Sequence, residues 1–432
     1  MLRTHYVKDV TPEMDGKTVT VAGWVHETRT FGPVNFVLLR DRSGIVQLIF
    51  KKGGVSEELL LKAKKLVKET AMVCTGKVKR DAKAKLGIEL VPETLEIVGP
   101  VLKKIPFELT GKVPAELDVR LDNRFVDLRR VETQAVFKIR AEVQAAFREK
   151  CMQLDLQEIN PPSIVESATE GGTDLFEVKY FEKKAFLAQS PQLYKQLAVI
   201  GGMDGVFMIS PIWRAEKHNT TQHLNEITQM DVELGFADEN DALDYLESVA
   251  LHILKRVSER CPTALQTLKQ EIRVPKKIKR YTYTELVEWL NQDGERMKWG
   301  DDFTKEQEGK LGKRLKEEMF IITRWPTDSR AFYSMPLKDN PKICKAYDLM
   351  YRGLEIASGA QRIHEPELLI RQLKARDLDP DQFESYIDAF RYGAVPHAGW
   401  SIGSERITML ICGLSNIRET ALFPRDRTRL TP

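Results

Sequence analysis

The stretch from Phe207 to Glu233 constrains the fold most strongly, because charged and apolar residues alternate on both sides of a polar loop. It reads FMISPIWRAEKHNTTQHLNEITQMDVE. A side-chain period of two predicts two strands and puts Arg214 and Glu216 on one face of an extended chain. The Asn- and Thr-rich loop from His218 to Gln222 joins the strands into a predicted β-hairpin. Its charged face indicates either a bound polar ligand or a solvated antiparallel sheet, and this stretch alone leaves both open.

A second stretch, from His397 to Gly413, combines glycines with the start of a helix. Gly399 and Gly403 flank a short predicted strand, and an apolar helix from Ile407 to Leu414 follows Arg406. Glycines let a ligand approach the backbone closely, and a helix N-terminus favours anions. The fork of Arg406 suits phosphate, whereas the helix dipole does not suit its charge, which indicates a functional role. Taken alone, the glycine spacing favours a structural turn.

Together the two stretches resemble class II aminoacyl-tRNA synthetases. Arg214 of WRAE is similar to the arginine of the family's ATP-binding motif 2, and Arg406 of GSER to that of motif 3. The helix before Leu156 and the segment LQEINPPSIV, with Pro162, resemble motif 1, which lies at the family's dimer interface. Five segments resemble archaeal-type aspartyl-tRNA synthetases: ATEGGTDLF, FLAQSPQLYKQ, HNTTQHLNE, EIASGAQR and FPRDRTRLTP. The resemblance covers essentially the whole chain and implies a homodimer.

The composition bounds the remaining possibilities. A chain of 432 residues is expected to hold two or more domains. No apolar run is long enough to span a membrane, and the polar start MLRTHYVKDV does not resemble a signal peptide. The five cysteines lack CxxC spacing, which argues against disulfides and a zinc site and for the reducing cytoplasm. The net charge of +3 does not by itself indicate a nucleic-acid partner.

The first hundred residues predict a β-barrel. The strand-like segments are KTVTVAGWV, FVLLRD, IVQLIF, AMVCTGKVK and GIELVPETLEIVG, and SEELLLKAKKLVKE is an amphipathic helix. Five strands with one helix predict an OB-fold, which commonly binds single-stranded nucleic acid. We therefore predict an α+β chain, with an N-terminal five-stranded OB-fold β-barrel followed by a class II catalytic domain built on an antiparallel sheet flanked by helices. The expected parts are an anticodon-binding domain at 1–102, a hinge at 103–120, and a catalytic domain at 121–432 with a solvated insertion at about 261–320.

Five barrel residues are candidates for contact with the anticodon. Phe36 could stack on a base and Gln47 could read a base edge, although its pattern alone makes Phe36 a core residue. The resemblance assigns both to the central anticodon base, and Arg29 belongs to the same candidate surface. The anticodons for aspartate and asparagine differ only at the third base, C against U. His26 resembles the relaxed members that charge both tRNAs, Lys85 resembles the strict ones, and an exposed strand residue without RNA contact remains the alternative for His26.

The resemblance also implies an aspartate pocket. Arg362 has a fork that suits a side-chain carboxylate, whereas the amide of asparagine would set N–H against N–H. Gln192 and Lys195 share one helix face, for which a solvated face is the commoner explanation. The loop TEGGTDLF around Glu170 closes over aspartate in the resembling family, and a structural turn is its alternative. The implied aspartate-binding residues are Glu170, Gln192, Lys195, Arg214, Asp231, Ser358 and Arg362.

The ATP and Mg²⁺ sites follow from the same resemblance. Mg²⁺ prefers few carboxylates together with phosphate oxygens. Glu355 with Ser358 is therefore the first metal position and Asp348 a second, seven residues away on a stretch that is expected to be extended. The alternative is acidic residues on a strand that faces water. The implied ATP-binding residues are Arg214, Ala215, Glu216, Gln222, His223, Leu224, Glu355, Gly403, Ser404, Glu405 and Arg406, with Arg214 and Arg406 as the catalytic pair.

The predicted reaction joins L-aspartate to tRNA(Asp), and to tRNA(Asn) as well, through an aspartyl-adenylate made from ATP. Positioning and charge neutralisation carry this chemistry, with little covalent work for the protein. Four alternatives stay open: a strictly discriminating aspartyl enzyme, an asparaginyl-tRNA synthetase, an asparagine synthetase on the same core, and a non-catalytic RNA-binding derivative. The N-terminal barrel argues against the synthetase of free asparagine, and the presence of Arg214, Glu355 and Arg406 argues against a derivative without activity.

Overall fold

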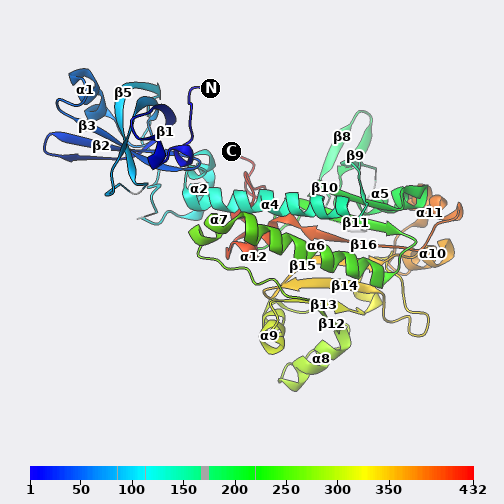
Figure 1. The fold of residues 1–432 in the computed structure, drawn as a ribbon. Helices are drawn as coiled ribbons and strands as arrows, with labels where there is room; N and C mark the ends of the chain where they lie inside the picture. Colours follow the sequence, from blue (N-terminus) through cyan, green and yellow to red (C-terminus); the bar gives the residue numbers. More distant parts are fainter. Residues whose placement is uncertain (85, 112, 167–174, 219) are drawn as a thin grey trace. The chain divides into compact units, whose positions relative to one another are not determined.

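A computed structural model describes residues 1–84, 86–111, 113–166, 175–218 and 220–432 (Figure 1). The chain divides into two compact units, Met1–Val126 and Asp127–Pro432. Between the barrel strands of the first unit and its C-terminal helices, residues 100–111 and 113–116 have no regular secondary structure.

The first unit contains a closed barrel with the strand order β1-β2-β3-β5-β4. Neighbouring strands are antiparallel except β3 and β5, which run parallel. Apolar side chains from alternate positions fill the barrel, as the period of two requires. The predicted five-stranded barrel is confirmed. Its elements are β1 (Thr18–Phe31), β2 (Val34–Asp41), β3 (Gly44–Lys51), α1 (Glu57–Lys65), β4 (Ala71–Arg80) and β5 (Ile88–Gly99).

The second unit is built on an eight-stranded sheet with the order β12-β13-β14-β15-β16-β11-β10-β6. The strands from β13 to β10 in this order pair antiparallel, while β12 and β6 add parallel edges. The predicted antiparallel sheet is therefore confirmed. The strands are β6 (Gln157–Glu158), β10 (Gly205–Trp213), β11 (Glu226–Gly235), β12 (Lys279–Thr282), β13 (Met319–Thr323), β14 (Ala346–Tyr351), β15 (Leu354–Gln361) and β16 (His397–Gly403), and a smaller sheet contains β7 (Ile164–Val165), β8 (Glu177–Tyr180) and β9 (Lys183–Leu187).

Helices cover one face of the large sheet. In Figure 1, α4 and α6 lie side by side along it, and they pack on the buried residues of β11 and β16. Met230, Val232 and Leu234 of β11 belong to this core, so the alternate residues Asp231 and Glu233 lie on the opposite face. The helices of the second unit are α4 (Val131–Gln153), α5 (Gln192–Ala198), α6 (Glu239–Arg260), α7 (Pro262–Thr267), α8 (Tyr283–Gln292), α9 (Lys305–Leu315), α10 (Pro366–Lys374), α11 (Glu384–Arg391) and α12 (Ser404–Ile411).

The hairpin of β10 and β11 is confirmed, but three local predictions are wrong. Arg214 and Glu216 lie beyond the end of β10 at Trp213, in the loop rather than on the strand. Helix α12 ends at Ile411 rather than Leu414. Asp348 and Glu355 do not share one extended stretch, because β14 and β15 form a hairpin that turns at Arg352–Gly353. Both turn residues have positive φ, 47° and 77°, as a tight two-residue hairpin turn requires.

The segment 261–320 joins the second unit at the edge of its sheet. Strand β12 extends the sheet, and α8 packs on an aromatic core with Tyr283, Phe320 and Trp325. Helix α9 is charged on its outer surface and buries Leu311. The small residues Gly309 and Gly312 let α9 approach the β14–β15 turn closely: a Cβ added at Gly312 would lie 4.0 Å from the Gly353 backbone, and one added at Gly353 would lie 3.5 Å from Gly309 Cα.

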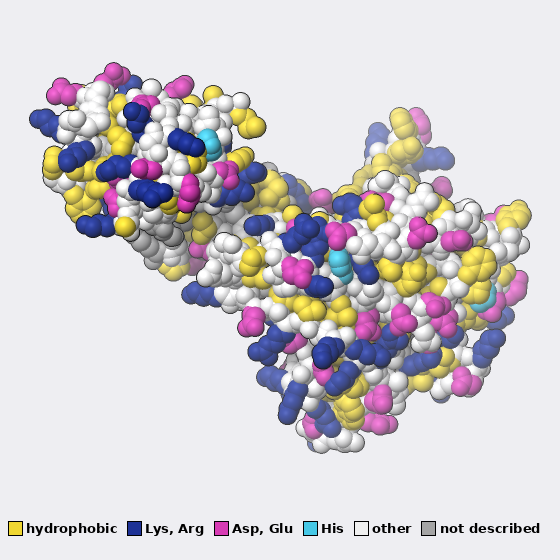
Figure 2. All heavy atoms as spheres, viewed as in Figure 1, with side chains coloured by type: hydrophobic (Ala, Val, Ile, Leu, Met, Phe, Trp, Pro, Cys, Tyr) yellow, Lys and Arg dark blue, Asp and Glu magenta, His cyan; other side chains and the backbone are white. Residues whose placement is uncertain are grey.

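The surface carries both signs of charge. On the face drawn in Figure 2, lysine and arginine side chains are interspersed with acidic ones, in agreement with the small net charge of +3. Among the helices of the described residues, none is both long and apolar enough to cross a membrane.

Candidate active site

Two adjoining cavities lie on the face of the large sheet opposite α4 and α6. Their volumes are about 280 and 210 Å³. Both are lined by Arg214, Gln229, Ser358 and Ser401, so these four side chains mark the place where the cavities meet. Most of the predicted ATP residues line the larger cavity, and most of the predicted aspartate residues line the smaller one.

The smaller cavity is built on a buried network of two cations and two carboxylates. Lys195 Nζ donates to Asp231 Oδ1 over 2.9 Å and lies 3.5 Å from Glu233 Oε2. Arg362 donates through Nε and Nη2 to the two oxygens of Glu233 over 2.9 and 3.1 Å. All four residues are at most 3% exposed. Buried charges are tolerated only when they are paired in this way, so the network is balanced before any ligand binds.

The ionisation of the two carboxylates differs because their partners differ. Burial raises the pKa of Asp231, and Lys195 only partly opposes this. Burial acts in the same direction on Glu233, but Arg362 and Lys195 outweigh it and leave the pKa of Glu233 below its ordinary value. Glu233 is therefore firmly ionised, and Asp231 is the carboxylate with capacity for a further positive charge.

The position of Arg362 revises one part of the expected recognition. The sequence predicts that its fork grips the side chain of aspartate, but Glu233 already occupies Nε and Nη2. Nη1 is left for a ligand, since within the described ranges it makes no hydrogen bond and Arg362 lines the cavity. The carboxylate of Glu233 thus orients the guanidinium, and the edge that remains can donate from a single nitrogen.

Unsatisfied buried polar atoms show what kind of ligand the cavity is built for. Gln192 Nε2 and Gln229 Oε1 are both buried, and within the described part of the chain neither has a hydrogen-bond partner. Both side chains line the 210 Å³ cavity. Because buried polar groups are nearly always hydrogen-bonded, these atoms point to a polar ligand with both donors and acceptors.

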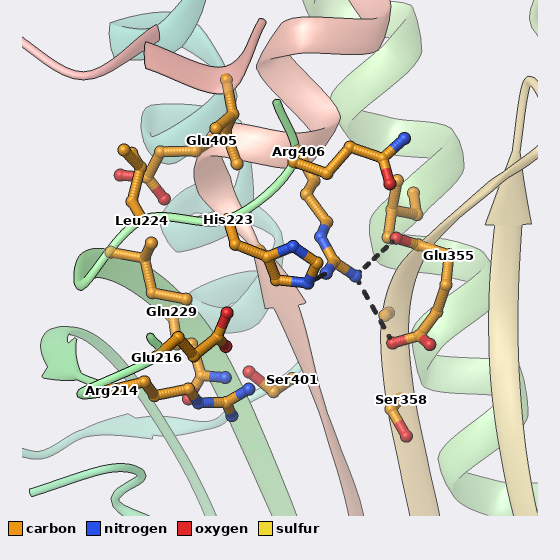
Figure 3. A pocket seen from close by; sticks show the side chains of 16 residues that line it. Arg214, Glu216, His223, Leu224, Gln229, Glu355, Ser358, Ser401, Glu405 and Arg406 are labelled. Atoms are coloured by element: carbon orange, nitrogen blue, oxygen red, sulfur yellow. Dashed lines mark hydrogen bonds and ion pairs between the residues drawn. The ribbon is translucent and has the colours of Figure 1, made fainter. Parts of the chain in front are cut away.

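In the 280 Å³ cavity, Arg406 lies between His223 and Glu355 (Figure 3). Its Nη1 donates to the Glu355 backbone oxygen over 3.2 Å and lies 3.9 Å from Glu355 Oε1. Its Nη2 lies 3.3 Å from His223 Nε2. Burial lowers the pKa of His223; Glu216 opposes this effect, and Arg406 and Arg214 add to it. His223 is therefore neutral, and its Nε2 accepts from Arg406 because a guanidinium has only donors.

The C-terminal tail holds the loop between β10 and β11. The Arg214 backbone N–H donates to the Asn225 oxygen over 2.9 Å, and the Asn225 N–H in turn donates to the Arg425 oxygen over 2.9 Å. Arg418 Nη1 donates to the Thr220 oxygen over 2.9 Å. This loop carries the predicted motif 2. The tail segment FPRDRTRLTP contacts it through the Arg425 backbone, and Arg418, just before that segment, contacts it through its side chain.

The Arg214 side chain itself has no partner within the described ranges, neither a hydrogen bond nor an ion pair. It lines both cavities where they meet. Figure 3 shows its guanidinium beside Glu216, directed into the pocket. An unpaired cation at the junction of two polar cavities is positioned to receive an anion from either side.

Asp348, Glu355 and Ser358 lie close together across the β14–β15 hairpin, where Asp348 is the direct partner of Ser358. Burial and the neighbouring Asp348 raise the pKa of Glu355 to about 7, against the effect of Arg406. The two carboxylates therefore repel each other, which a divalent cation would relieve. Asp348 is already paired with Arg330, whose Nη1 lies 3.3 Å from Oδ1. No cluster of three or more His, Cys, Asp or Glu side chains suited to a metal occurs among the described residues, but Mg²⁺ with substrate phosphates needs fewer.

Several predicted residues lie apart from the cavities or have other partners. Ser404 is buried, and its Oγ accepts from Gln144 of α4 over 3.1 Å, away from the site. Ala215 lines neither cavity. Glu405 lines the larger cavity, but it accepts from the Thr228 N–H over 3.0 Å and pairs with an arginine of α4. Glu170 and Lys85 lie outside the described residues.

The segment 329–334, which no sequence pattern indicated, lines one side of the smaller cavity. Arg330, Tyr333 and Ser334 line it. The Arg330 guanidinium lies 3.7 Å from the ring centroid of Trp325 and pairs with Asp348. The segment follows strand β13 without a periodic pattern, so only its basic and aromatic composition, SRAFYS, offered a signal.

The barrel has a cavity of its own, of about 330 Å³. Three of the anticodon candidates, His26, Arg29 and Gln47, line it. Phe36 does not, and it packs edge to face on Phe31 with ring centroids 6.2 Å apart. Phe36 is partly exposed and lies outside the barrel core, so it is not the core residue that its pattern favours.

Comparison with known proteins places this site in a family. The model for tRNA synthetases class II (D, K and N) matches residues 116–427, and the model for the OB-fold nucleic acid binding domain matches residues 19–98. The chain belongs to the class II tRNA synthetases of the D, K and N group, a family that uses ATP and Mg²⁺. The predicted family and the α+β fold class are confirmed.

Individual relatives are similar along their whole length. The aspartate–tRNA(Asp/Asn) ligase of Methanocaldococcus jannaschii is 48% identical over 431 residues, which is 100% of this chain and 98% of that protein. The ligase of the same name from Archaeoglobus fulgidus is 46% identical, with 99% of each chain covered. Among solved structures, asparaginyl-tRNA synthetase from Pyrococcus horikoshii complexed with asparaginyl-adenylate superposes with a TM-score of 0.95 at 33% identity, covering 100% of both chains.

Proposed function

We propose that this chain attaches aspartate to tRNA(Asp) and to tRNA(Asn) through an aspartyl-adenylate made from aspartate and ATP. The observation that carries this proposal is the unpaired Arg214 at the junction of two polar cavities. The relatives named above as aspartate–tRNA(Asp/Asn) ligases support the choice of amino acid and of both tRNAs.

In the proposed first step, the α-carboxylate of aspartate attacks the α-phosphorus of ATP, a mixed anhydride forms, and pyrophosphate leaves. Arg214 lies where the two substrates meet, and its charge stabilises the additional negative charge on the phosphoryl oxygens. Arg406, with Glu355 and His223 on either side, binds the far end of the phosphate chain. In the second step the terminal adenosine hydroxyl of the tRNA attacks the activated carbonyl, and AMP leaves.

The smaller cavity is proposed to bind aspartate by charge. Lys195 and Nη1 of Arg362 donate to the side-chain carboxylate, while Asp231 and Gln192 serve the ammonium group. Both side-chain contacts present donors, so the amide nitrogen of asparagine would face another donor. Unpaired buried polar groups discriminate strongly between such ligands, and aspartate is therefore preferred.

The proposed metal site uses the carboxylates of β14 and β15. Asp348 and Glu355, with Ser358, would hold Mg²⁺, which neutralises phosphate oxygens when it is bound. The mutual repulsion of the two carboxylates fits such an ion, as does the place of Glu355 and Ser358 in the lining of the larger cavity. Asp348 also pairs with Arg330, so a bound ion would share this carboxylate with the arginine.

We further propose that the barrel binds the anticodon, that the chain forms a homodimer through the motif 1 region, and that it works in the cytoplasm. The OB-fold match and the cavity with His26, Arg29 and Gln47 support the first point. Five free, buried cysteines fit a reducing compartment.

Two assays test the proposal with one enzyme preparation. Aspartate-dependent exchange of labelled pyrophosphate into ATP tests adenylate formation, and aspartylation of both transcripts tests the transfer. Exchange that depends on asparagine instead would identify an asparaginyl enzyme. A product with tRNA(Asp) but none with tRNA(Asn) would identify a strictly discriminating enzyme. His26→Trp serves as the matched variant, since it should suppress charging of tRNA(Asn) and spare tRNA(Asp).

A further inference from the structure

A buried ion pair lies next to His26, one of the residues that line the barrel cavity. Arg40 Nη2 donates to both oxygens of Glu69 over 3.0 and 2.8 Å, and the two residues are 3% and 6% exposed. Glu69 also has a positive φ of 68°, which a residue other than glycine rarely adopts. Its backbone N–H donates to the Val25 oxygen over 2.7 Å. A strained, buried acid that is held by both its backbone and its side chain indicates that its position serves a function.

Arg40 of this ion pair also contacts the ring of His26. The register of β1 against β2 shifts between Val25 and Glu27, so His26 occupies a bulge. Bulges redirect a side chain, and the ring of His26 lines the 330 Å³ cavity. Arg40 Nη1 lies 3.0 Å from His26 Nδ1.

This contact determines which nitrogen of the ring carries the proton. A guanidinium has only donors, so Nδ1 must accept and the proton of the neutral ring must be on Nε2. Burial and the nearby Arg40 also lower the pKa of His26, which favours the neutral ring. Across the described residues the ring makes no other hydrogen bond, and the Nε2–H is its remaining polar group.

We propose that Arg40, anchored by Glu69, is a positioning residue that holds His26 as a hydrogen-bond donor toward the third anticodon base. The proposal rests on the proposed function, in which both tRNA(Asp) and tRNA(Asn) are charged. Cytosine and uracil both present an O2 acceptor, and they differ at N3 and at position 4. In this role the Nε2–H donates to O2, the one acceptor that both bases carry at the same position, whereas an acceptor at Nε2 could pair only with the N3–H of uracil or the amino group of cytosine.

Base analogues at the third anticodon position test which atom is read. A tRNA with pyridin-2-one keeps only the O2 acceptor, and a tRNA with pyridin-4-one keeps only the oxygen at position 4. We expect the wild-type enzyme to aspartylate the pyridin-2-one tRNA with kcat/KM close to that of the native tRNA. The pyridin-4-one tRNA should lose about three- to tenfold, the factor expected for one neutral hydrogen bond. Equal use of both analogues would overturn the proposal.

The role of Arg40 is tested with Arg40→Met/Glu69→Gln, which removes both charges and leaves no buried ion unpaired. The preference for pyridin-2-one should disappear in this variant. A matched control, Lys77→Met/Glu93→Gln, removes an exposed pair of the same barrel 4.0 Å apart and should keep the preference. A preference that persists in the first variant would overturn the role of Arg40.

A spectroscopic readout separates positioning from mere bracing of the barrel. In full-length protein labelled with ¹⁵N-histidine, the His26 signals, assigned with His26→Gln, should show an unprotonated Nδ1 and a protonated Nε2. In Arg40→Met/Glu69→Gln they should shift toward a mixture of tautomers. A protonated Nδ1 in the wild type would overturn the proposal. Absence of aspartylation of either native tRNA would instead reject the proposed function, and the tautomer measurement would still report on Arg40.

Discussion

Removal of the Arg362 guanidinium should affect stability and aspartate recognition by separate routes. In Arg362→Leu, the carboxylate of Glu233 loses the partner that holds it at 2.9 and 3.1 Å, and Glu233 is fully buried. Breaking a buried pair in this way costs about 3–5 kcal/mol, a large part of the usual total of about 5–15 kcal/mol. With an m-value of about 3 kcal/mol/M, the urea midpoint should fall by about 1 M or more. Lys195, 3.5 Å from Glu233, limits the loss.

The double variant Arg362→Leu/Glu233→Gln separates the two effects. Its buried amide costs about 1–3 kcal/mol, so about 2 kcal/mol of the stability should return. Aspartate use should not return, because Nη1 is absent from the cavity in both variants. The loss in kcat/KM for aspartate should be about 10- to 100-fold, as for a hydrogen bond to a charged group, with the KM for ATP unchanged.

Urea unfolding and aspartate-dependent pyrophosphate exchange measure the two effects on the same samples. Recovery of aspartate use in the double variant would refute the assignment of Arg362 to the amino-acid cavity, as would equal losses for aspartate and ATP. A single variant as stable as the wild type would refute the energetic reasoning about Glu233.

Three further predictions concern other parts of the chain. Arg214→Ala should reduce pyrophosphate exchange by orders of magnitude with an unchanged urea midpoint, and near-normal exchange would contradict its role. Sedimentation at working concentration should give a dimer that forms through the region of Pro162; a monomer would contradict this. Burial would raise the pKa of Asp426, but Arg418 and the hydrogen bonds from Thr428 together outweigh it and hold this pKa at about 2, below the value of about 3.9 in an unfolded chain. Asp426 therefore stabilises the fold fully above about pH 4 and loses this effect as the pH falls toward 2. Asp426→Asn should therefore cost about 1 kcal/mol at pH 7, after allowance for solvent screening, and almost nothing near pH 2; a pH-independent difference in urea midpoint would refute this.

Local periodicity made much of the fold predictable. The period of two in the stretch from Phe207 to Glu233 identified the β10–β11 hairpin, and short strands with turn signals identified the barrel. The turn at Arg352–Gly353 was missed because the stretch from Asp348 to Glu355 was interpreted as one strand, although the glycine was a sufficient signal. Periodicity indicates which side of a strand is buried in the core. The charged residues at the alternate positions then lie together on the opposite face, where the site is.

The partners of those charged residues depended on tertiary structure. The sequence alone supplied Arg362, Lys195 and Arg214 as candidates, and the resemblance supplied their expected roles. Neither the sequence nor the resemblance showed that Glu233, 129 positions from Arg362 along the chain, occupies two nitrogens of that arginine. Neither showed that Arg40 sets the tautomer of His26. Ion pairs and hydrogen bonds between distant segments require donor and acceptor atoms within about 3 Å. Such distances result from strand register, bulges and packing of the whole unit, which no local pattern in the sequence encodes.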